Sequence, residues 1–204
     1  MTARKMCQAL LVTWALLGGG MVFAQDTVDV IMSTSEGDVR IELYASQAPV
    51  TVENFLKYVD GGHYEGGSFY RTVTYENDNG NPKIEVIQGG LGNGIDAPFP
   101  PIAHEDTEAT GIQHTDGVVS MARNGVGTAS SEFFICLGDQ PGLDKGELRN
   151  PDEQGFAAFG KVVDGMDVVM RIHQAPAAAP SYSEYTKGQI IEDPVQILTI
   201  RRAD

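Results

Sequence analysis

The chain is poor in the residues and patterns that mark several classes of protein. Its 204 residues contain two cysteines and only 14 Lys and Arg against 28 Asp and Glu, a net charge of −14. Two cysteines exclude a disulfide-rich scaffold. The acidic excess disfavours binding to nucleic acid or anionic lipid and favours solubility. The sequence also has no N-x-S/T site, no fixed-period repeat and no long apolar run beyond its first 24 residues, so no membrane span is expected in the remainder.

The first 24 residues have the features of an export signal. Arg4 and Lys5 form a short basic region, an apolar run follows from 6 to 17, and Val22-Phe23-Ala24 fits the small-residue pattern before a signal-peptidase cut. A membrane anchor is the alternative, but the apolar run is short and three glycines follow it, which suits a stable span poorly. We therefore expect residues 1–24 to be a cleaved signal peptide.

Cleavage would leave residues 25–204 as one domain. These 180 residues carry 12 basic and 28 acidic side chains, a net charge of −16, and one cysteine, Cys136. An intramolecular disulfide is then impossible, and a cysteine inside an apolar segment is expected to be a buried, inert thiol. The size fits a single domain with an ample core. We expect a monomer located in the bacterial periplasm.

Alternation of apolar and polar residues predicts a hairpin near the start of this domain. The segments 28–32 and 38–44 are rich in β-branched residues and are separated by a polar, glycine-ended turn. Pro49 then opens a segment of helical period that ends at Gly61-Gly62. The apolar face of this helix holds four residues at helical spacing: Val52, Phe55, Leu56 and Val59.

The rest of the domain consists of short strands, a second helix and loops. Strands are expected at 67–73, 84–90, 117–123, 130–136, 157–163 and 195–202. The helix lies within 164–175, and its expected apolar face holds Met166, Val169, Met170 and Ile172. Polar or proline-rich loops are expected at 75–83, 138–155 and 175–185. Short strands with two helices predict a mainly β fold, a closed antiparallel barrel capped by two α-helices.

The strand SSEFFIC carries an aromatic ring on both of its faces. Because side chains alternate along a strand, one face holds Ser131, Phe133 and Ile135, and the other holds Glu132, Phe134 and Cys136. In a small barrel one face fills the interior. The other face packs under a helix or lines an external groove, and periodicity alone leaves both alternatives open.

The sequence carries no recognisable motif for a cofactor, a metal or a hydrolytic nucleophile. The glycine-rich segment 89–94 lacks the G-x-G-x-x-G register and a following Lys-Ser/Thr, so we interpret it as a backbone turn. The histidines have no ligand spacing, and no matching motif supports the one candidate cation site, His104-Glu105-Asp106. No serine lies in a nucleophile elbow. Neither a metal nor a cofactor is expected.

Five segments, taken in order, resemble the cyclophilin family of peptidyl-prolyl isomerases, and especially its exported bacterial members. They are FYR (69–71), IQGG (87–90), SMARNG (120–125), SEFFIC (131–136) and GFAAFGKVVDGMDVV (155–169). Each segment alone is a weak signal, but their order and spacing together are specific, and the resemblance runs from Val28 to Arg201. It implies an eight-stranded antiparallel barrel closed by two helices, with no cofactor.

The resemblance also implies a peptide-binding groove on the outer face of SSEFFIC. Arg71 matches the catalytic arginine, and Gln88 matches a glutamine of the groove. Phe134 and Leu143 match residues of the proline pocket. The edge segment that binds the peptide backbone is matched by Ala122, Arg123 and Asn124.

Four positions depart from the family's pattern. Glu132 stands in place of a glutamine, Phe156 of a groove histidine, Gly142 of a tryptophan and Glu85 of an apolar aromatic residue. We hypothesise that Glu132 pairs with Arg71, which would orient the arginine or compete with substrate for its donors. The missing tryptophan disfavours tight binding of cyclosporin.

The resemblance implies an isomerase that acts on Xaa-Pro bonds of unfolded or newly exported polypeptides. Arg71 would stabilise the twisted amide while Phe134 and Leu143 hold the proline ring. A chain without an acid–base pair suits this reaction, because rotation over a barrier of roughly 18–20 kcal/mol breaks no covalent bond. The alternative is a module that binds or shields proline-containing segments with little catalysis, and the altered groove at Glu132 and Gly142 favours it.

Overall fold

The computed structural model describes residues 26–92, 95–181 and 183–203, so the expected signal peptide lies outside the described residues. The strands are β1 Val28–Thr34, β2 Gly37–Leu43, β3 Ser68–Val73, β4 Val86–Gly90, β5 Val118–Met121, β6 Phe133–Cys136, β7 Ala157–Asp164 and β8 Ile190–Arg202. The helices are α1 Pro49–Asp60, α2 Thr107–Thr110 and α3 Met166–His173, with two short 3-10 helices, η1 Pro141–Leu143 and η2 Glu184–Thr186.

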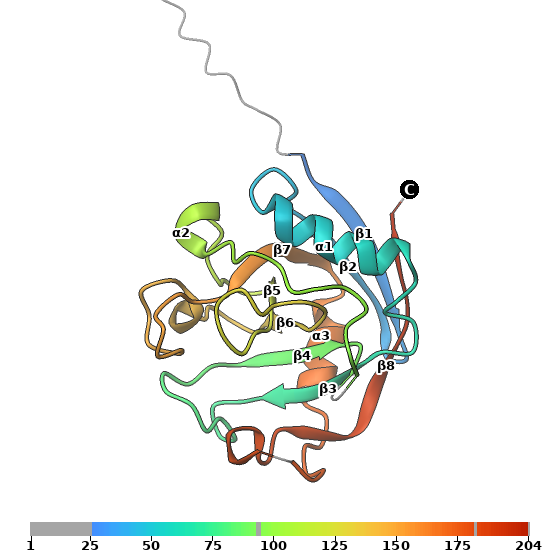
Figure 1. Cartoon of the computed structure of the whole chain (residues 1–204). Helices are drawn as coiled ribbons and strands as arrows, with labels where there is room; N and C mark the ends of the chain where they lie inside the picture. The colour runs from blue at the N-terminus through green and yellow to red at the C-terminus, as the bar shows by residue number, and fades with distance from the viewer. Residues whose placement is uncertain (1–25, 93–94, 182, 204) are drawn as a thin grey trace, which may run out of the picture.

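The strands close into an antiparallel barrel in the order β1-β2-β7-β5-β6-β4-β3-β8, and β8 pairs with β1 to complete it. Figure 1 shows β3, β4 and β6 side by side, with α1 and α3 packed on the barrel. The closed eight-stranded barrel confirms the predicted fold. Its register places Gln88 of β4 directly opposite Arg71 of β3 and Phe134 of β6. Directly opposed residues point to the same face of a sheet, so these three side chains share the outer face.

Helix α1 has the predicted bounds and the predicted buried face. Pro49 occupies the first turn, where its missing N–H costs nothing, and Val52, Phe55, Leu56 and Val59 are all buried. The carboxylate of Glu105 accepts the N–H groups of Val50 and Thr51 at 3.1 and 2.8 Å. Side-chain acceptors of this kind satisfy the free donors of a helix start.

The apolar face predicted for α3 is wrong at Met170. The buried residues are Val168, Val169 and Ile172, whereas Met170 is half exposed. Met170 lies two positions from both Val168 and Ile172, which is about 200° around an α-helix. A one-sided helix of this length therefore cannot bury all of them. The short helix α2, capped by the side chain of Asp106, was not predicted.

All eight strands differ from their predicted bounds by one or more residues, and β8 differs most. β8 begins at Ile190 instead of 195 because Arg71 of β3 pairs with Ile190, which extends the ladder. β4 begins at Val86 and β6 at Phe133. Glu132 therefore precedes its strand, although its carbonyl oxygen still accepts the N–H of Ala122 at 2.8 Å.

The two faces of β6 divide the apolar interior into two clusters. Phe133 and Ile135 belong to the main core inside the barrel, where Phe133 makes edge-on ring contacts with Phe55, Tyr64 and Phe69. Phe134 and Cys136 lie in a second cluster. Cys136 is fully buried and burial raises the pKa of its thiol, which makes it unreactive as expected.

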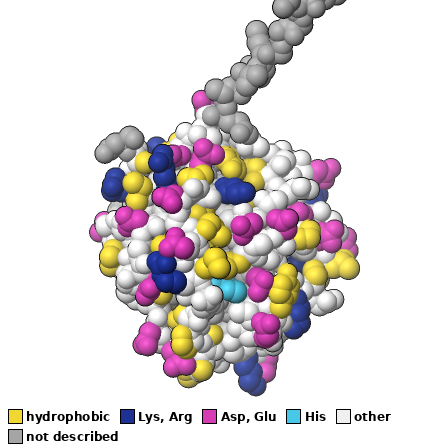
Figure 2. Space-filling model, turned by 180° about the vertical axis from the view of Figure 1, so that it is seen from behind, with side chains coloured by type: hydrophobic (Ala, Val, Ile, Leu, Met, Phe, Trp, Pro, Cys, Tyr) yellow, Lys and Arg dark blue, Asp and Glu magenta, His cyan; other side chains and the backbone are white. Residues whose placement is uncertain are grey.

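On the face seen in Figure 2, acidic side chains are spread out and form no single concentrated patch. Figure 2 shows Asp and Glu side chains spread over one face, with Lys and Arg between them. Within residues 26–92, 95–181 and 183–203, no helix is long and apolar enough to cross a membrane, and no cluster of three or more His, Cys, Asp or Glu could hold a metal ion. Glu105 and Asp106 cap helices, and His104 contacts the carbonyl oxygen of Gln154 at 2.9 Å.

We expect Phe133→Ala to lower the free energy of unfolding by about 3–5 kcal/mol, because it empties the centre of the main core. Urea unfolding of the purified chain measures this. Leu198→Ala on β8 is the matched control, since Leu198 is half exposed and its loss should change stability by about 0.5 kcal/mol or less. Equal effects of the two substitutions would contradict the core described above.

Candidate functional site

A cavity of about 620 Å³ lies over the outer faces of β3, β4 and β6. All nine residues proposed from the sequence line it: Arg71, Gln88, Ala122, Arg123, Asn124, Glu132, Phe134, Leu143 and Phe156. They come from strands and loops that are far apart in the chain. The outer face of β6 therefore lines a groove, which resolves the alternative that periodicity left open.

The floor of this cavity is apolar. The rings of Phe134 and Phe156 meet edge to face, with centroids 5.3 Å apart and an interplanar angle of 90°. Leu143 in η1 is almost fully buried, and the side chain of Val86 packs in the same cluster. Edge-to-face rings beside branched aliphatic groups form a rigid surface that can hold a small apolar ring.

Arg71 forms the polar wall of the cavity and is held by neutral groups. Its Nε and Nη2 donate to Oε1 of Gln189 at 2.9 and 2.7 Å, and its Nη1 donates to Oε1 of Gln88 at 2.8 Å. None of the ion pairs found among the described residues includes Arg71. Burial lowers the pKa of the guanidinium below its ordinary value, but arginine stays charged in proteins.

The hypothesis that Glu132 pairs with Arg71 is wrong. Oε1 of Glu132 accepts the N–H of Leu91 at 3.0 Å and the hydroxyl of Ser131 at 3.2 Å, and its Oε2 has no hydrogen-bond partner among the described residues. The carboxyl group packs over Gly90, where an added Cβ would lie 2.7 Å from it. Three of the five N–H donors of Arg71 bind glutamines instead, and none binds Glu132.

A polar chain nevertheless runs from Arg71 towards Glu132. Gln88 accepts from Arg71 and donates through Nε2 to the hydroxyl of Tyr70 at 2.8 Å. Tyr70 also lines the cavity, and burial, followed by the charge of Glu132, raises its pKa well above the ordinary value. Burial likewise raises the pKa of Glu132, against the lowering effect of the hydrogen bonds that it accepts.

Arg123 supports the wall of the cavity through its side chain. Its Nη1 and Nη2 donate to the two carboxylate oxygens of Asp152 at 2.7 and 2.8 Å, and its Nε donates to the carbonyl of Gly155 at 2.8 Å. Its guanidinium also lies over the ring of Phe156, 5.2 Å from the centroid. The bond from Arg123 lowers the pKa of Asp152 to about 2. These donors are therefore occupied within the protein.

Sequence reasoning missed an Asp–His–Ser arrangement beneath Phe134. His114 contacts Asp144 through Nδ1 at 2.7 Å and Ser120 through Nε2 at 2.9 Å. The side chain of His114 and the whole of Ser120 are fully buried, so a substrate cannot reach this hydroxyl. The imidazole stacks on Phe134 with centroids 5.9 Å apart. The arrangement supports the floor of the cavity, and no local motif marks it because the three residues are widely spaced.

The loop 75–83 leaves no room at Gly142 for the tryptophan of the family pattern. A Cβ added at Gly142 would lie 2.5 Å from Cγ of Pro82, which belongs to the loop 75–83. Two neighbours of Glu85, Ile84 and Val86, line the cavity, whereas Glu85 is not among its lining residues. Glu85, which replaces an apolar aromatic residue of the family pattern, therefore forms no part of the cavity wall.

The comparisons with known proteins agree with this fold and cavity. A sequence profile described as cyclophilin type peptidyl-prolyl cis-trans isomerase/CLD matches residues 28–202. Peptidyl-prolyl cis-trans isomerase A of Dickeya dadantii is 33% identical over 176 residues, covering 84% of this chain and 85% of that protein. A peptidyl-prolyl cis-trans isomerase of Acinetobacter baylyi is 30% identical over 191 residues, with 91% and 92% covered.

Solved structures show the same fold. A crystal structure of a cyclophilin type peptidyl-prolyl cis-trans isomerase from Cryptosporidium parvum, 23% identical, superimposes with a TM-score of 0.65 over 87% of this chain and 98% of that chain. A structure of that protein in the presence of the dipeptide Ala-Pro gives a TM-score of 0.66. The fold and the match over residues 28–202 define a peptidyl-prolyl isomerase. The chain belongs to the cyclophilin family and is an enzyme of this class.

We expect Glu132→Gln to stabilise the chain at neutral pH but not in acid. Because burial raises the pKa of Glu132 above 4.5, the unfolded chain loses this proton first as the pH rises. The free energy of unfolding of the parent therefore falls between pH 4.5 and the folded pKa. The glutamine of the variant keeps an acceptor oxygen for Leu91 and Ser131. Because it does not ionise, its burial does not lower the free energy of unfolding as the pH rises.

Urea unfolding of parent and Glu132→Gln at about pH 4 and about pH 7 measures this difference. The variant should be more stable than the parent at the higher pH, and the gap should close at the lower pH. A gap of the same size at both pH values would show that ionisation of Glu132 has no part in it.

We expect Gly142→Ala to lower the free energy of unfolding by about 1–3 kcal/mol, because the added methyl group meets Pro82. Gly125→Ala is the matched control, since its Cβ would find Thr128 at 3.9 Å, an ordinary contact. It should change stability by about 0.5 kcal/mol or less. A tolerated alanine at 142 would mean that the loop 75–83 does not pack against η1.

Proposed function

We propose that Arg71 accelerates rotation about Xaa-Pro peptide bonds by stabilising the twisted amide. Resonance gives the peptide C–N bond partial double-bond character, and rotation faces a barrier of roughly 18–20 kcal/mol. In the twisted state the prolyl nitrogen regains a lone pair, which accepts a hydrogen bond far better than the planar amide does. A donor that is stronger towards the twisted state than towards the planar state lowers the barrier.

The observation that carries this proposal is the charge of Arg71 on the cavity wall. Three of its nitrogens donate to the amide oxygens of Gln88 and Gln189. Carbonyl acceptors orient a guanidinium without neutralising it, so the charge remains available to the twisted amide. A fixed, charged donor beside an apolar floor needs little reorganisation when the bond rotates.

The apolar floor supports a role in holding the proline. Phe134, Phe156 and Leu143 offer the rigid surface on which a pyrrolidine ring would rest while the preceding carbonyl rotates. Gln88, which faces both Arg71 and Phe134 across the sheet, would anchor the substrate backbone. The segment Ala122–Asn124 along the cavity edge would bind the peptide main chain.

The substrates we propose are unfolded or newly exported polypeptides in the bacterial periplasm. The signal-like residues 1–24 and the two bacterial relatives support this location. The cavity is an open groove that takes its substrate as an extended segment, so an accessible chain suits it better than a folded one. No nucleotide is needed, since the enzyme only speeds an equilibrium.

We expect Arg71→Ala to reduce the accelerated cis–trans exchange of a short Xaa-Pro peptide by about a hundredfold or more. Exchange spectroscopy by NMR measures the rate directly. Arg71→Lys should be intermediate at best, because one ammonium cannot reproduce the planar set of donors. Arg171→Ala on α3 is the matched control, since this exposed arginine pairs with Asp167 and neither residue lines the cavity.

Unchanged exchange in a folded Arg71→Ala chain would refute the role of Arg71. Peptide binding by the parent without faster exchange would instead favour a binding module that recognises proline-containing segments. The two results are distinguishable, because chemical-shift changes report binding and exchange peaks report rotation in the same samples.

A further inference from the structure

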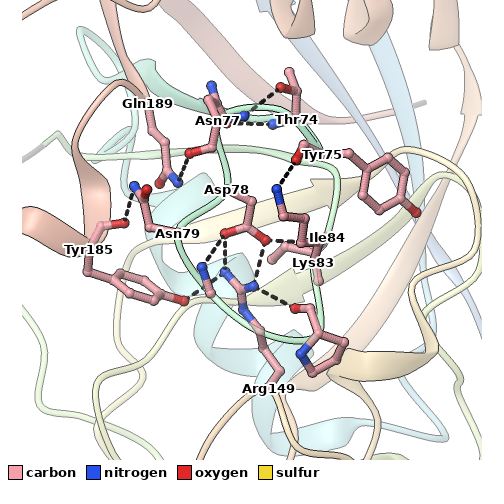
Figure 3. A network of polar contacts seen from close by, with 12 residues as sticks. Thr74, Tyr75, Asn77, Asp78, Asn79, Lys83, Ile84, Arg149, Tyr185 and Gln189 are labelled. Atoms are coloured by element: carbon pink, nitrogen blue, oxygen red, sulfur yellow. Dashed lines mark hydrogen bonds and ion pairs between the residues drawn. The ribbon is translucent and has the colours of Figure 1, made fainter.

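Three segments that lie between predicted strands and helices meet at one end of the cavity. They are residues 75–83, 144–150 and 183–189, and we call them the rim. Arg149 joins them: its Nη1 and Nη2 donate to the two carboxylate oxygens of Asp78 at 2.6 and 2.8 Å, and its Nη2 also donates to the hydroxyl of Tyr185 at 2.8 Å. Figure 3 shows this network, with Asp78 above Arg149 and Tyr185 to one side.

The rim is rigid because the ion pair that joins its segments is buried and its backbone is cross-linked. The side chains of Asp78 and Arg149 are 0% and 1% exposed. Asp78 also accepts the N–H groups of Gly80 and Ile84. A buried ion pair with all its bonds made fixes the geometry of the parts that it joins, and its loss is costly.

Further bonds tie the first segment of the rim to the third. Nδ2 of Asn77 donates to the carbonyl of Gly188 at 3.0 Å, and Nδ2 of Asn79 donates to the carbonyl of Lys187 at 3.0 Å. Nε2 of Gln189 donates to the carbonyl of Asn77 at 2.9 Å. Gln189 also accepts hydrogen bonds from Arg71. It therefore links the rim to the cavity wall that holds Arg71.

Tyr185 is the exposed aromatic residue by which the rim lines the cavity. It lines the cavity and is 46% exposed, although its hydroxyl is tied to Arg149. Its ring lies 5.5 Å from the guanidinium of Arg71 and 5.5 Å from that of Arg149. Held in this way, the ring can be covered by a ligand with little further loss of conformational entropy.

The free surface offered here is apolar. Both terminal nitrogens of Arg149 are already bound, and Asp78 neutralises its charge, so Arg149 has little to offer an anion. The hydroxyl of Tyr185 is engaged as well, so the part of the residue that stays open to a ligand is the ring carbon surface that the guanidinium groups of Arg71 and Arg149 leave uncovered. An apolar or aromatic side chain is the chemistry that such a surface recognises.

We propose that Tyr185 forms a subsite for an apolar or aromatic side chain next to the substrate proline. The inference rests on the proposed function, since it takes the prolyl amide to lie at Arg71. An extended chain advances about 3.3–3.6 Å per residue, and Tyr185 lies 5.5 Å from the guanidinium of Arg71. The immediate neighbour of the proline is therefore the residue whose side chain reaches the ring.

A second group at the rim is suited to the peptide backbone. Asn150 lines the same cavity, and its Nδ2 is buried without a hydrogen-bond partner among the described residues. Buried polar groups are nearly always paired, and a carbonyl oxygen of the bound segment would pair this one. The rim thus provides an aromatic platform for a side chain and an amide donor for the main chain.

The experiment uses peptides that contain one proline and differ only in its neighbours: Phe before it, Phe after it, or Ser on both sides. Affinity is measured from NMR chemical shifts and rotation from exchange peaks, for the parent, Tyr185→Ala and Tyr185→Phe. Tyr75→Ala is the matched control, because Tyr75 is also 46% exposed but does not line the cavity. In Figure 3 its ring projects on the opposite side of the network from Tyr185.

We expect the parent to bind at least one Phe peptide about three- to tenfold more tightly than the Ser peptide. Tyr185→Ala should abolish this preference, whereas Tyr185→Phe and Tyr75→Ala should keep it. No preference in the parent, or an equal loss for all three peptides in Tyr185→Ala, would overturn the subsite. A Tyr185-dependent preference in binding without faster rotation would refute the isomerase role of the cavity and leave the subsite standing.

Discussion

The geometry of the groove depends on how Arg71 is held. Two glutamines, Gln88 and Gln189, bind three of its nitrogens through their amide oxygens. A carboxylate in their place would bind the guanidinium more strongly but would also neutralise it. Despite 28 acidic residues in the chain, the described ion pairs leave Arg71 out. The cavity wall therefore keeps a positive charge that is oriented and partly desolvated.

This arrangement is a consequence of the barrel register. β3 pairs with β4 so that Arg71 faces Gln88, and β4 pairs with β6 so that Gln88 faces Phe134. The early start of β8 at Ile190 brings Gln189 beside β3. A closed barrel leaves no free edge along which these strands could slip, so the wall that holds Arg71 and the apolar floor stay in fixed relation. The main core and the groove lie on opposite faces of the same strand, β6.

Periodicity and family resemblance predicted the parts that depend on local order. The barrel, helix α1 and the two faces of β6 followed from apolar spacing, and the residues gathered around the cavity followed from matched segments. Met170 was misassigned because a short helix allows more than one plausible apolar face. Glu132 was wrongly predicted to pair with Arg71, because the sequence does not show which acceptor side chains lie next to the guanidinium in the folded chain.

The rim was beyond prediction for a physical reason. Asp78, Arg149 and Tyr185 lie in three separate polar segments, and polar loops carry no period that reports their partners. Their contact is visible only once the barrel has brought the loops together. The same holds for His114, Asp144 and Ser120 beneath Phe134. Loops on a rigid scaffold carry much of the specificity in proteins, and here they come next to Arg71 and Phe134 only in the folded chain.

The central claim is that the charge of Arg71, and not merely its shape, lowers the barrier to rotation. The most direct measurement replaces Arg71 by citrulline, a neutral urea of nearly the same shape, and determines the cis–trans exchange rate of an Xaa-Pro peptide by NMR. We expect the rate to fall most of the way to the uncatalysed rate while the peptide still binds. Exchange as fast as in the parent would show that the charge contributes nothing and would contradict the mechanism.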